Sequence, residues 1–302
     1  MLSFPERLAG RALQASGLRR DKVRTEVGDV HYLKGSGKGQ LPFVLLHGLS
    51  ANAIAYGDLI RRILPSVDTL IAPDMPGHGY SPTPREGLDA TAMTDAVFEA
   101  LDQLIDRPAV LLGNSMGGLA AIRYAAARPH KIRGLLLVSP GGAPMTQEEL
   151  DQVLSIFRIE SHQQGLDFVD RIFAQSPKLL RHAIARGSKQ RFAHRTMRDF
   201  ISGIDAKDLL TREEVGRLSM PTLIVWGRDE KVLPIKNLAW FAEHLPAHAE
   251  IERWQDFGHI GFMERPAALT RRVELFLGAL EGRGSSAPVS PGLIAPRSLA
   301  YI

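Results

Sequence analysis

Short runs of apolar residues recur along this chain, and segments with apolar positions at helical spacing lie between several of them. Each run is four or so residues long and requires burial on both of its faces. Strands of this kind that alternate with helices form a parallel sheet covered by helices on both sides. The sequence therefore predicts an α/β protein with a mostly parallel sheet, whose buried strands lie near residues 43–46, 70–72, 110–112, 135–138 and 223–226.

Other segments complete this pattern. Two alternating runs, 22–27 and 30–34, flank a Gly-Asp pair and predict a hairpin before the first buried strand. Helical spacing predicts helices near 54–64, 91–105, 117–127 and 266–280, and a last strand over 250–254.

The alternation breaks between Pro140 and Met220, where only helical patterns occur. We expect a helical insertion over 141–219, after the sixth strand, in a core made of residues 22–140 and 220–281. Residues 282–302 are rich in Gly, Ser and Pro, which predicts a disordered tail.

Residues 1–21 alternate leucines with arginines and predict a basic amphipathic helix. Such a helix can attach to an anionic membrane surface, but packing against the body of the protein is favoured. The chain has no cysteine, which excludes disulfides, thiolate metal sites and a cysteine nucleophile. A net charge of +4 does not argue for nucleic acid, and no run reaches the roughly 20 apolar residues of a membrane span. We expect a cytoplasmic protein, with peripheral membrane contact as an alternative.

The strongest local motif is Gly113-Asn114-Ser115-Met116-Gly117-Gly118, which follows a predicted strand and precedes a predicted helix. This is the context of a nucleophile elbow, in which a sharp turn raises the serine hydroxyl above the sheet edge. The small residues on either side of Ser115 let neighbouring segments approach closely. Ser115 is therefore the predicted nucleophile.

A serine hydroxyl needs a base within hydrogen-bond reach, and the base needs an acid to orient it. His259 follows the last predicted strand and is the predicted base. Asp229 follows the preceding predicted strand and is the predicted acid, with its neighbour Glu230 as competitor.

An oxyanion hole requires two N–H donors near the nucleophile. Met116 N–H begins the helix after Ser115, and Leu49 N–H lies in the loop after strand 43–46. We expect the imidazole of His47 to brace this loop. Asp74, in the turn Asp74-Met75-Pro76-Gly77-His78-Gly79, is expected to be structural.

These motifs together resemble those of the α/β-hydrolase superfamily over residues 25–281. Within it, His47-Gly48-Leu49-Ser50 and Ser139-Pro140-Gly141-Gly142 are most similar to the capped monoacylglycerol-lipase and carboxylesterase branch. The resemblance implies the α/β-hydrolase fold and a triad in the chain order Ser115, Asp229, His259. It also implies that the insertion is a helical cap over the pocket.

The resemblance implies a serine esterase or lipase that needs no cofactor and no metal. A second branch, the carbon–carbon bond hydrolases of aromatic ring-cleavage products, also resembles the chain through Gly113-Asn114-Ser115-Met116-Gly117-Gly118. Its oxyanion loop is usually richer in glycine than Leu49-Ser50-Ala51-Asn52. A transacylase, a perhydrolase and a non-catalytic binding module remain alternatives.

The substrate is expected to be a small ester with an apolar acyl group. Ser50 and Asn114 are expected to line the substrate pocket. Apolar residues of the insertion are candidates for an acyl pocket, with packing of the insertion's own core as the alternative: Leu154, Phe157, Phe168, Ile172 and Phe173. Residues 178–198 carry seven basic side chains and no acidic one. They are candidates for contact with anionic headgroups, although a solvated helix face is the favoured interpretation.

Overall fold

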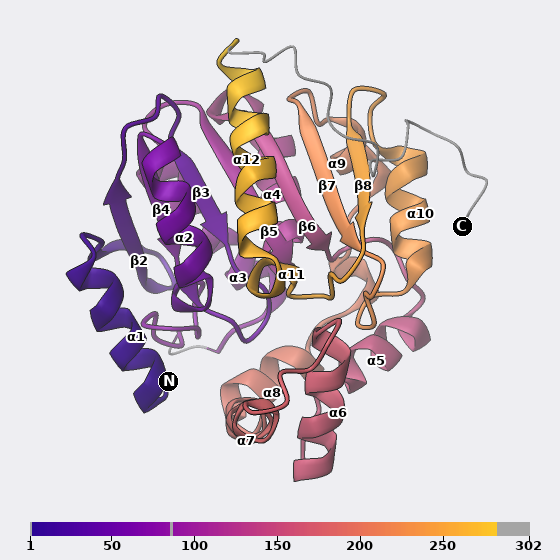
Figure 1. Cartoon of the computed structure of the whole chain (residues 1–302). Helices are drawn as coiled ribbons and strands as arrows, with labels where there is room; N and C mark the ends of the chain where they lie inside the picture. The colour runs from indigo at the N-terminus through magenta and orange to yellow at the C-terminus, as the bar shows by residue number, and fades with distance from the viewer. Residues whose placement is uncertain (1, 85–86, 283–302) are drawn as a thin grey trace.

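A computed structural model describes residues 2–84 and 87–282. Its centre is an eight-stranded sheet in the order β1-β2-β4-β3-β5-β6-β7-β8 (Figure 1). The pairs β1–β2 and β2–β4 are antiparallel, and the pairs from β4 through β3 to β8 are parallel. The strands are β1 (Arg19–Thr25), β2 (Gly28–Ser36), β3 (Phe43–Leu46), β4 (Thr69–Pro73), β5 (Ala109–Ser115), β6 (Ile132–Pro140), β7 (Thr222–Gly227) and β8 (Glu250–Trp254).

Successive residues of the central strands face opposite sides of the sheet, and both sides are covered. One face is covered by α2 (Gly57–Ile63) and α12 (Pro266–Leu280), and the other by α3 (Ala90–Leu104), α4 (Met116–Ala127) and α10 (Ile235–His244). Along β3, Phe43 and Leu45 pack with α2 and α12, while Val44 and Leu46 pack with α3 and α4. The apolar runs of the sequence are thus buried on both faces, which confirms the predicted sheet.

The N-terminal helix α1 (Phe4–Ala15) begins at a capping box formed by Ser3 and Glu6. Leu13 is buried in the same core as α2 and α12, and Gly10 packs closely against Ile54. Leu8 is exposed on the outer side. The helix therefore packs on the body of the protein, as the favoured interpretation expected.

A helical segment, here called the insertion (residues 141–221), joins β6 to β7. It contains α5 (Gln147–Ser155), α6 (His162–Ile172), α7 (Arg181–Phe192), α8 (Arg195–Ser202) and α9 (Arg212–Gly216). Figure 1 shows α5 to α8 beyond the carboxyl ends of the parallel strands, where loops of an α/β sheet carry binding sites. The helical insertion after the sixth strand is thus present as predicted.

The remaining elements are short. Four 3-10 turns, η1 (Ala53–Tyr56), η2 (Leu64–Ser66), η3 (Pro129–Lys131) and η4 (Ala206–Asp208), and the helix α11 (Gly261–Glu264) complete the described chain. None of the helices in residues 2–84 and 87–282 is long and apolar enough to cross a membrane. The tail predicted to be disordered lies, from residue 283 on, outside the described residues.

Candidate active site

Ser115 ends β5 and stands at the N-cap of α4 in a strained conformation, with φ 53° and ψ −120°. A serine at an N-cap normally accepts a hydrogen bond from the first turn of its helix. Here the side chain makes no such capping bond. The turn therefore leaves the hydroxyl available for chemistry, as a nucleophile elbow requires.

Glycines on either side of Ser115 make this turn possible. A Cβ at Gly113 would lie 2.3 Å from the carbonyl oxygen of Gly117, and a Cβ at Gly117 would lie 2.2 Å from the carbonyl oxygen of Leu46. Distances this short exclude any side chain at either position. The structure thus confirms that small residues let α4 approach β5 and β3.

The loop after β3 lies directly beside the nucleophile. A Cβ at Gly48 would lie 3.2 Å from the Cβ of Ser115, so the Gly48–Leu49 peptide is next to the serine side chain. Met116 is the first residue of α4, and the first N–H groups of a helix have no partner within it. Leu49 and Met116 are therefore in the loop and the helix turn that can supply an oxyanion hole.

His47 holds the peptide group that carries the Leu49 N–H. Its Nε2 accepts a hydrogen bond from Met75 N–H at 2.9 Å, so Nδ1 carries the proton and donates to the carbonyl oxygen of Gly48 at 2.8 Å. Burial lowers the pKa of His47 to about 3, which keeps the ring neutral. A neutral, doubly bonded imidazole braces this loop, as the sequence predicted.

The main chain of His259 is tied to the turn at Ser115 by the side chain of Asn114. The Asn114 side-chain amide donates to the carbonyl oxygens of Val138 and His259, at 2.9 and 3.1 Å, and its Oδ1 accepts from the Tyr56 hydroxyl at 3.0 Å. The residue before the serine thus ties the His259 loop to the elbow. Because these bonds occupy both ends of the amide, Asn114 acts as a brace between the two loops, and that it also lines the substrate pocket stays a prediction.

The carboxylate that orients His259 comes from Glu230. Its Oε2 lies 2.9 Å from Nδ1 of His259, and both side chains are almost fully buried. Asp229 instead turns Oδ2 toward the backbone N–H of Phe257, at 3.4 Å. The predicted acid is thus corrected from Asp229 to its neighbour: the turn after β7 directs residue 230, and not 229, at the ring.

Glu230 is held in its charged form although it is buried. Burial alone would raise its pKa, but His259 and the N–H groups of Leu233 and Val232 outweigh burial and lower the pKa. Oε1 accepts from these N–H groups at 2.8 Å for Val232 and 3.0 Å for Leu233. An ionised carboxylate only accepts hydrogen bonds, so Nδ1 of His259 carries the proton and Nε2 is left as the basic nitrogen.

Known protein families contain a match to this chain. The sequence model of the family described as "Alpha/beta hydrolase family" matches residues 43–272, about three quarters of the chain. The chain belongs to the alpha/beta hydrolase family.

Two relatives of this hydrolase are named for different substrates. A "2-hydroxy-6-oxononadienedioate/2-hydroxy-6-oxononatrienedioate hydrolase" of Cupriavidus pinatubonensis is 26% identical, with 80% of this chain and 89% of the relative covered. "Monoacylglycerol lipase abhd6-B" of Xenopus laevis is 27% identical, with 80% of this chain and 77% of the relative covered. Among solved structures, serine hydrolase CCSP0084 from Cycloclasticus zankles shares the fold, with a TM-score of 0.75, 21% identity, and 87% of this chain and 99% of that chain covered.

Asp74 and His78 support the site from beneath the loop. Asp74 accepts from Ala53 N–H at 2.7 Å and Tyr80 N–H at 2.9 Å, and burial raises its pKa to about 6. The His78 ring lies 5.1 Å from that of His47, and burial lowers its pKa to about 4. These contacts agree with the structural role expected for Asp74.

The apolar residues expected in the pocket are all buried in the insertion. Phe157 and Phe168 pack their rings against each other and against Phe192, so they form the core of the insertion. Ile172 and Phe173 lie against Gly258, because a Cβ there would touch their backbone. Leu154 and Ser50 are also buried. That these residues line a pocket stays a prediction, and the pair beside Gly258 contacts the His259 loop.

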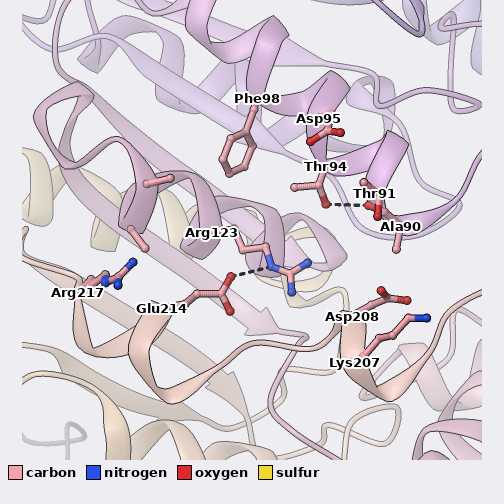
Figure 2. A pocket seen from close by; sticks show the side chains of 12 residues that line it. Ala90, Thr91, Thr94, Asp95, Phe98, Arg123, Lys207, Asp208, Glu214 and Arg217 are labelled. Atoms are coloured by element: carbon pink, nitrogen blue, oxygen red, sulfur yellow. Dashed lines mark hydrogen bonds and ion pairs between the residues drawn. The ribbon is translucent and has the colours of Figure 1, made fainter.

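A hollow of about 430 Å³ lies away from the candidate site of this hydrolase (Figure 2). It is lined mainly by residues of α3, α4, η4 and α9, and Figure 2 shows Arg123 in it, paired with Glu214. None of its lining residues belongs to the candidate site. Ser115 and His259 are themselves only 9% and 5% exposed, so the site is closed in this structure.

Proposed function

We propose that this alpha/beta hydrolase is a serine esterase that cleaves carboxylic esters with lipid-like acyl groups, such as monoacylglycerols. The observation that carries the proposal is the hydrogen bond from His259 Nδ1 to the buried carboxylate of Glu230, at 2.9 Å. It gives the imidazole a basic Nε2 on the loop that Asn114 ties to Ser115. The strained turn at Ser115, with its free hydroxyl, supports the same function.

The proposed reaction has two steps. Ser115 Oγ attacks the ester carbonyl while Nε2 of His259 takes its proton, and the N–H groups of Leu49 and Met116 bind the resulting oxyanion. The C–O bond to the alcohol breaks as His259 returns the proton to the leaving oxygen. Water, deprotonated by the same nitrogen, then attacks the acyl-enzyme and releases the acid. Glu230 stays ionised and stabilises the imidazolium in both steps.

Carbon–carbon bond hydrolysis is the second candidate, because one relative is named for a dienedioate substrate. A dienedioate carries two carboxylates, and a buried site needs cations to bind them. Arg191 contacts the oxyanion loop, but it already binds Glu6 and the carbonyl oxygen of Ser50. Because Glu6 already compensates the charge of Arg191, an uncharged ester suits this site better than a dianion.

A substrate panel separates the two candidates. We expect turnover of p-nitrophenyl esters between C2 and C16 and of monoacylglycerols, and much slower turnover of a ring-cleavage dienoate. Ser115→Ala should cut kcat by several orders of magnitude and abolish labelling by a fluorophosphonate, with an unchanged melting temperature. A folded Ser115→Ala protein with normal turnover would refute the proposal, and preferential cleavage of the dienoate would favour the second candidate. Product analysis with added alcohol or peroxide tests for acyl transfer to acceptors other than water.

Peripheral contact with an anionic membrane is also proposed, on a surface of the insertion rather than on α1. Leu179 is 99% exposed, Leu180 is largely exposed, and Lys178 precedes them, which gives an apolar tip beside positive charge. Vesicle binding should rise with the anionic lipid fraction and fall with added salt. Leu179→Asp should abolish this binding, whereas Leu275→Asp, on the exposed side of α12, should not. Binding that is equal in both variants would overturn the assignment.

A further inference from the structure

The guanidinium of Arg191 links three segments that are far apart in the sequence. Arg191 is the penultimate residue of α7 in the insertion. Its Nη1 donates to the carbonyl oxygen of Ser50 at 2.6 Å, and its Nη2 forms an ion pair with Oε1 of Glu6 in α1. One side chain thus joins the insertion, the oxyanion loop and the N-terminal helix.

The oxyanion loop needs such a partner, because its backbone is strained. Ser50 has a φ of 61°, in the left-handed region that costs energy for a residue other than glycine. Ser50 directly follows Leu49, whose N–H is the proposed oxyanion donor. A charge-assisted bond to the Ser50 carbonyl therefore stabilises the conformation that aims the Leu49 N–H at Ser115.

Both ends of the link are anchored. Phe192, next to Arg191, is buried in the ring cluster of the insertion, so the backbone of Arg191 is fixed. On the other side, Oε1 of Glu6 also accepts from the Asn52 side-chain amide at 2.8 Å, and Asn52 caps the turn that follows the loop. Glu6 is therefore bonded both to Arg191 and to the loop's own C-terminal end.

The charge state of Glu6 agrees with this arrangement. Burial opposes its ionisation, but the Arg191 guanidinium and hydrogen bonds from Ser3 lower its pKa. Glu6 thus stays ionised near neutral pH and keeps the guanidinium oriented. The loop is also held by His47, which donates to Gly48 and accepts from Met75 N–H, and by the bond from Ala51 N–H to the carbonyl oxygen of Gly48.

We propose that Arg191 is a positioning residue for the oxyanion hole, acting through the Ser50 carbonyl and held in place by Glu6. The inference rests on the proposed esterase function. It assigns a role in catalysis to a residue of the insertion and to the N-terminal helix, neither of which touches the reacting atoms. Contact of the insertion with Ser50 and formation of the oxyanion hole are thereby coupled.

The test compares Arg191→Gln with Arg186→Gln, a control on an exposed position of the same helix. With p-nitrophenyl acetate, Arg191→Gln should lower kcat about 100-fold, the order expected for a misplaced catalytic group, with KM changed less than about threefold. A trifluoromethyl ketone, which adds to the serine and forms an oxyanion, should lose affinity by the same factor as kcat. The matching methyl ketone, bound as an uncharged ground-state analogue, should not.

Two further variants keep the test independent of folding defects. Arg191→Lys should recover part of kcat, because a lysine can reach only one of the two partners at a time. Glu6→Gln leaves α7 unchanged and should cost about tenfold in kcat, as for the loss of a hydrogen bond with a charged partner.

Equal effects of Arg191→Gln and Arg186→Gln, or equal losses for the two ketones, would overturn the inference. If instead the wild type neither hydrolyses the ester nor reacts with a fluorophosphonate, the proposed function fails first and takes this inference with it.

Discussion

Replacing Glu230 with glutamine removes the charge beside His259 but keeps the shape of the side chain. In the structure, one oxygen of Glu230 accepts from His259, and the other accepts from the N–H groups of Val232 and Leu233. Glutamine has only one acceptor oxygen, so its NH₂ group must face one of these two sides. If the NH₂ faces the ring, the imidazole proton moves to Nε2, and the base can no longer accept the proton of Ser115.

The size of the effect follows from the charge that is lost. A carboxylate about 4 Å from the centre of an imidazolium contributes about 4 kcal/mol at an effective dielectric constant of about 20. That energy corresponds to about a 10³-fold decrease in kcat. The alternative rotamer of the amide in Glu230→Gln keeps the proton on Nδ1 of His259. It sets the NH₂ group against the N–H groups of residues 232 and 233, which lowers the stability of the folded protein.

Steady-state hydrolysis of p-nitrophenyl acetate measures this prediction, with Asp229→Asn as the matched control. Asp229 accepts a bond of 3.4 Å from the N–H of Phe257, so its amide should retain kcat within about tenfold of the wild type. Melting temperatures of both variants check that they fold. A loss of about 10³-fold in Asp229→Asn, with Glu230→Gln nearly unaffected, would refute the assignment of the acid.

Three other substitutions test the surroundings of the site. Gly117→Ala should lower the unfolding free energy by about 1–3 kcal/mol and impair turnover, because its Cβ would meet the Leu46 carbonyl at 2.2 Å; urea unfolding and kcat measure both effects. Phe168→Ala should cost about 3–5 kcal/mol by opening a cavity against Phe192, seen as faster proteolysis within the insertion. Because folding raises the pKa of Asp74 from 3.8 to about 6, the wild type should lose stability relative to Asp74→Asn as pH rises through this interval, measured by urea unfolding at pH 3.5 and 7. If the difference in unfolding free energy between the wild type and Asp74→Asn is the same at both pH values, the raised pKa of Asp74 is contradicted.

The sheet could be predicted because its strands are buried on both faces. A short run such as Leu135–Val138, apolar throughout, is typical of a strand buried on both faces, and it lies in β6 in the middle of the sheet. The last strand, Glu250–Trp254, and the closing helix over 266–280 were also located within their observed bounds. The sharp turn at Ser115 could be predicted because small residues at positions 113 and 117 are a direct steric requirement of that turn.

The sequence led to Asp229 instead of Glu230 as the partner of His259, because two adjacent carboxylates follow β7 and either position suits the chain order. The choice depends on the turn, which sets the Glu230 carboxylate over the N–H groups of residues 232 and 233. The hydrophobic periodicity of a sequence contains no information about the geometry of such a turn. The role of Arg191 was missed for a related reason: its partners are 141 and 185 residues away in the sequence.

The carboxylate of Glu264 connects the insertion to the loop that carries His259. One oxygen of its carboxylate accepts from Ala174 N–H at 2.8 Å, just after α6, and the other accepts from Gly258 N–H at 2.8 Å, just before His259. These two bonds tie the chain just after α6 to the turn that carries His259, so a displacement of this part of the insertion would also disturb the position of the base.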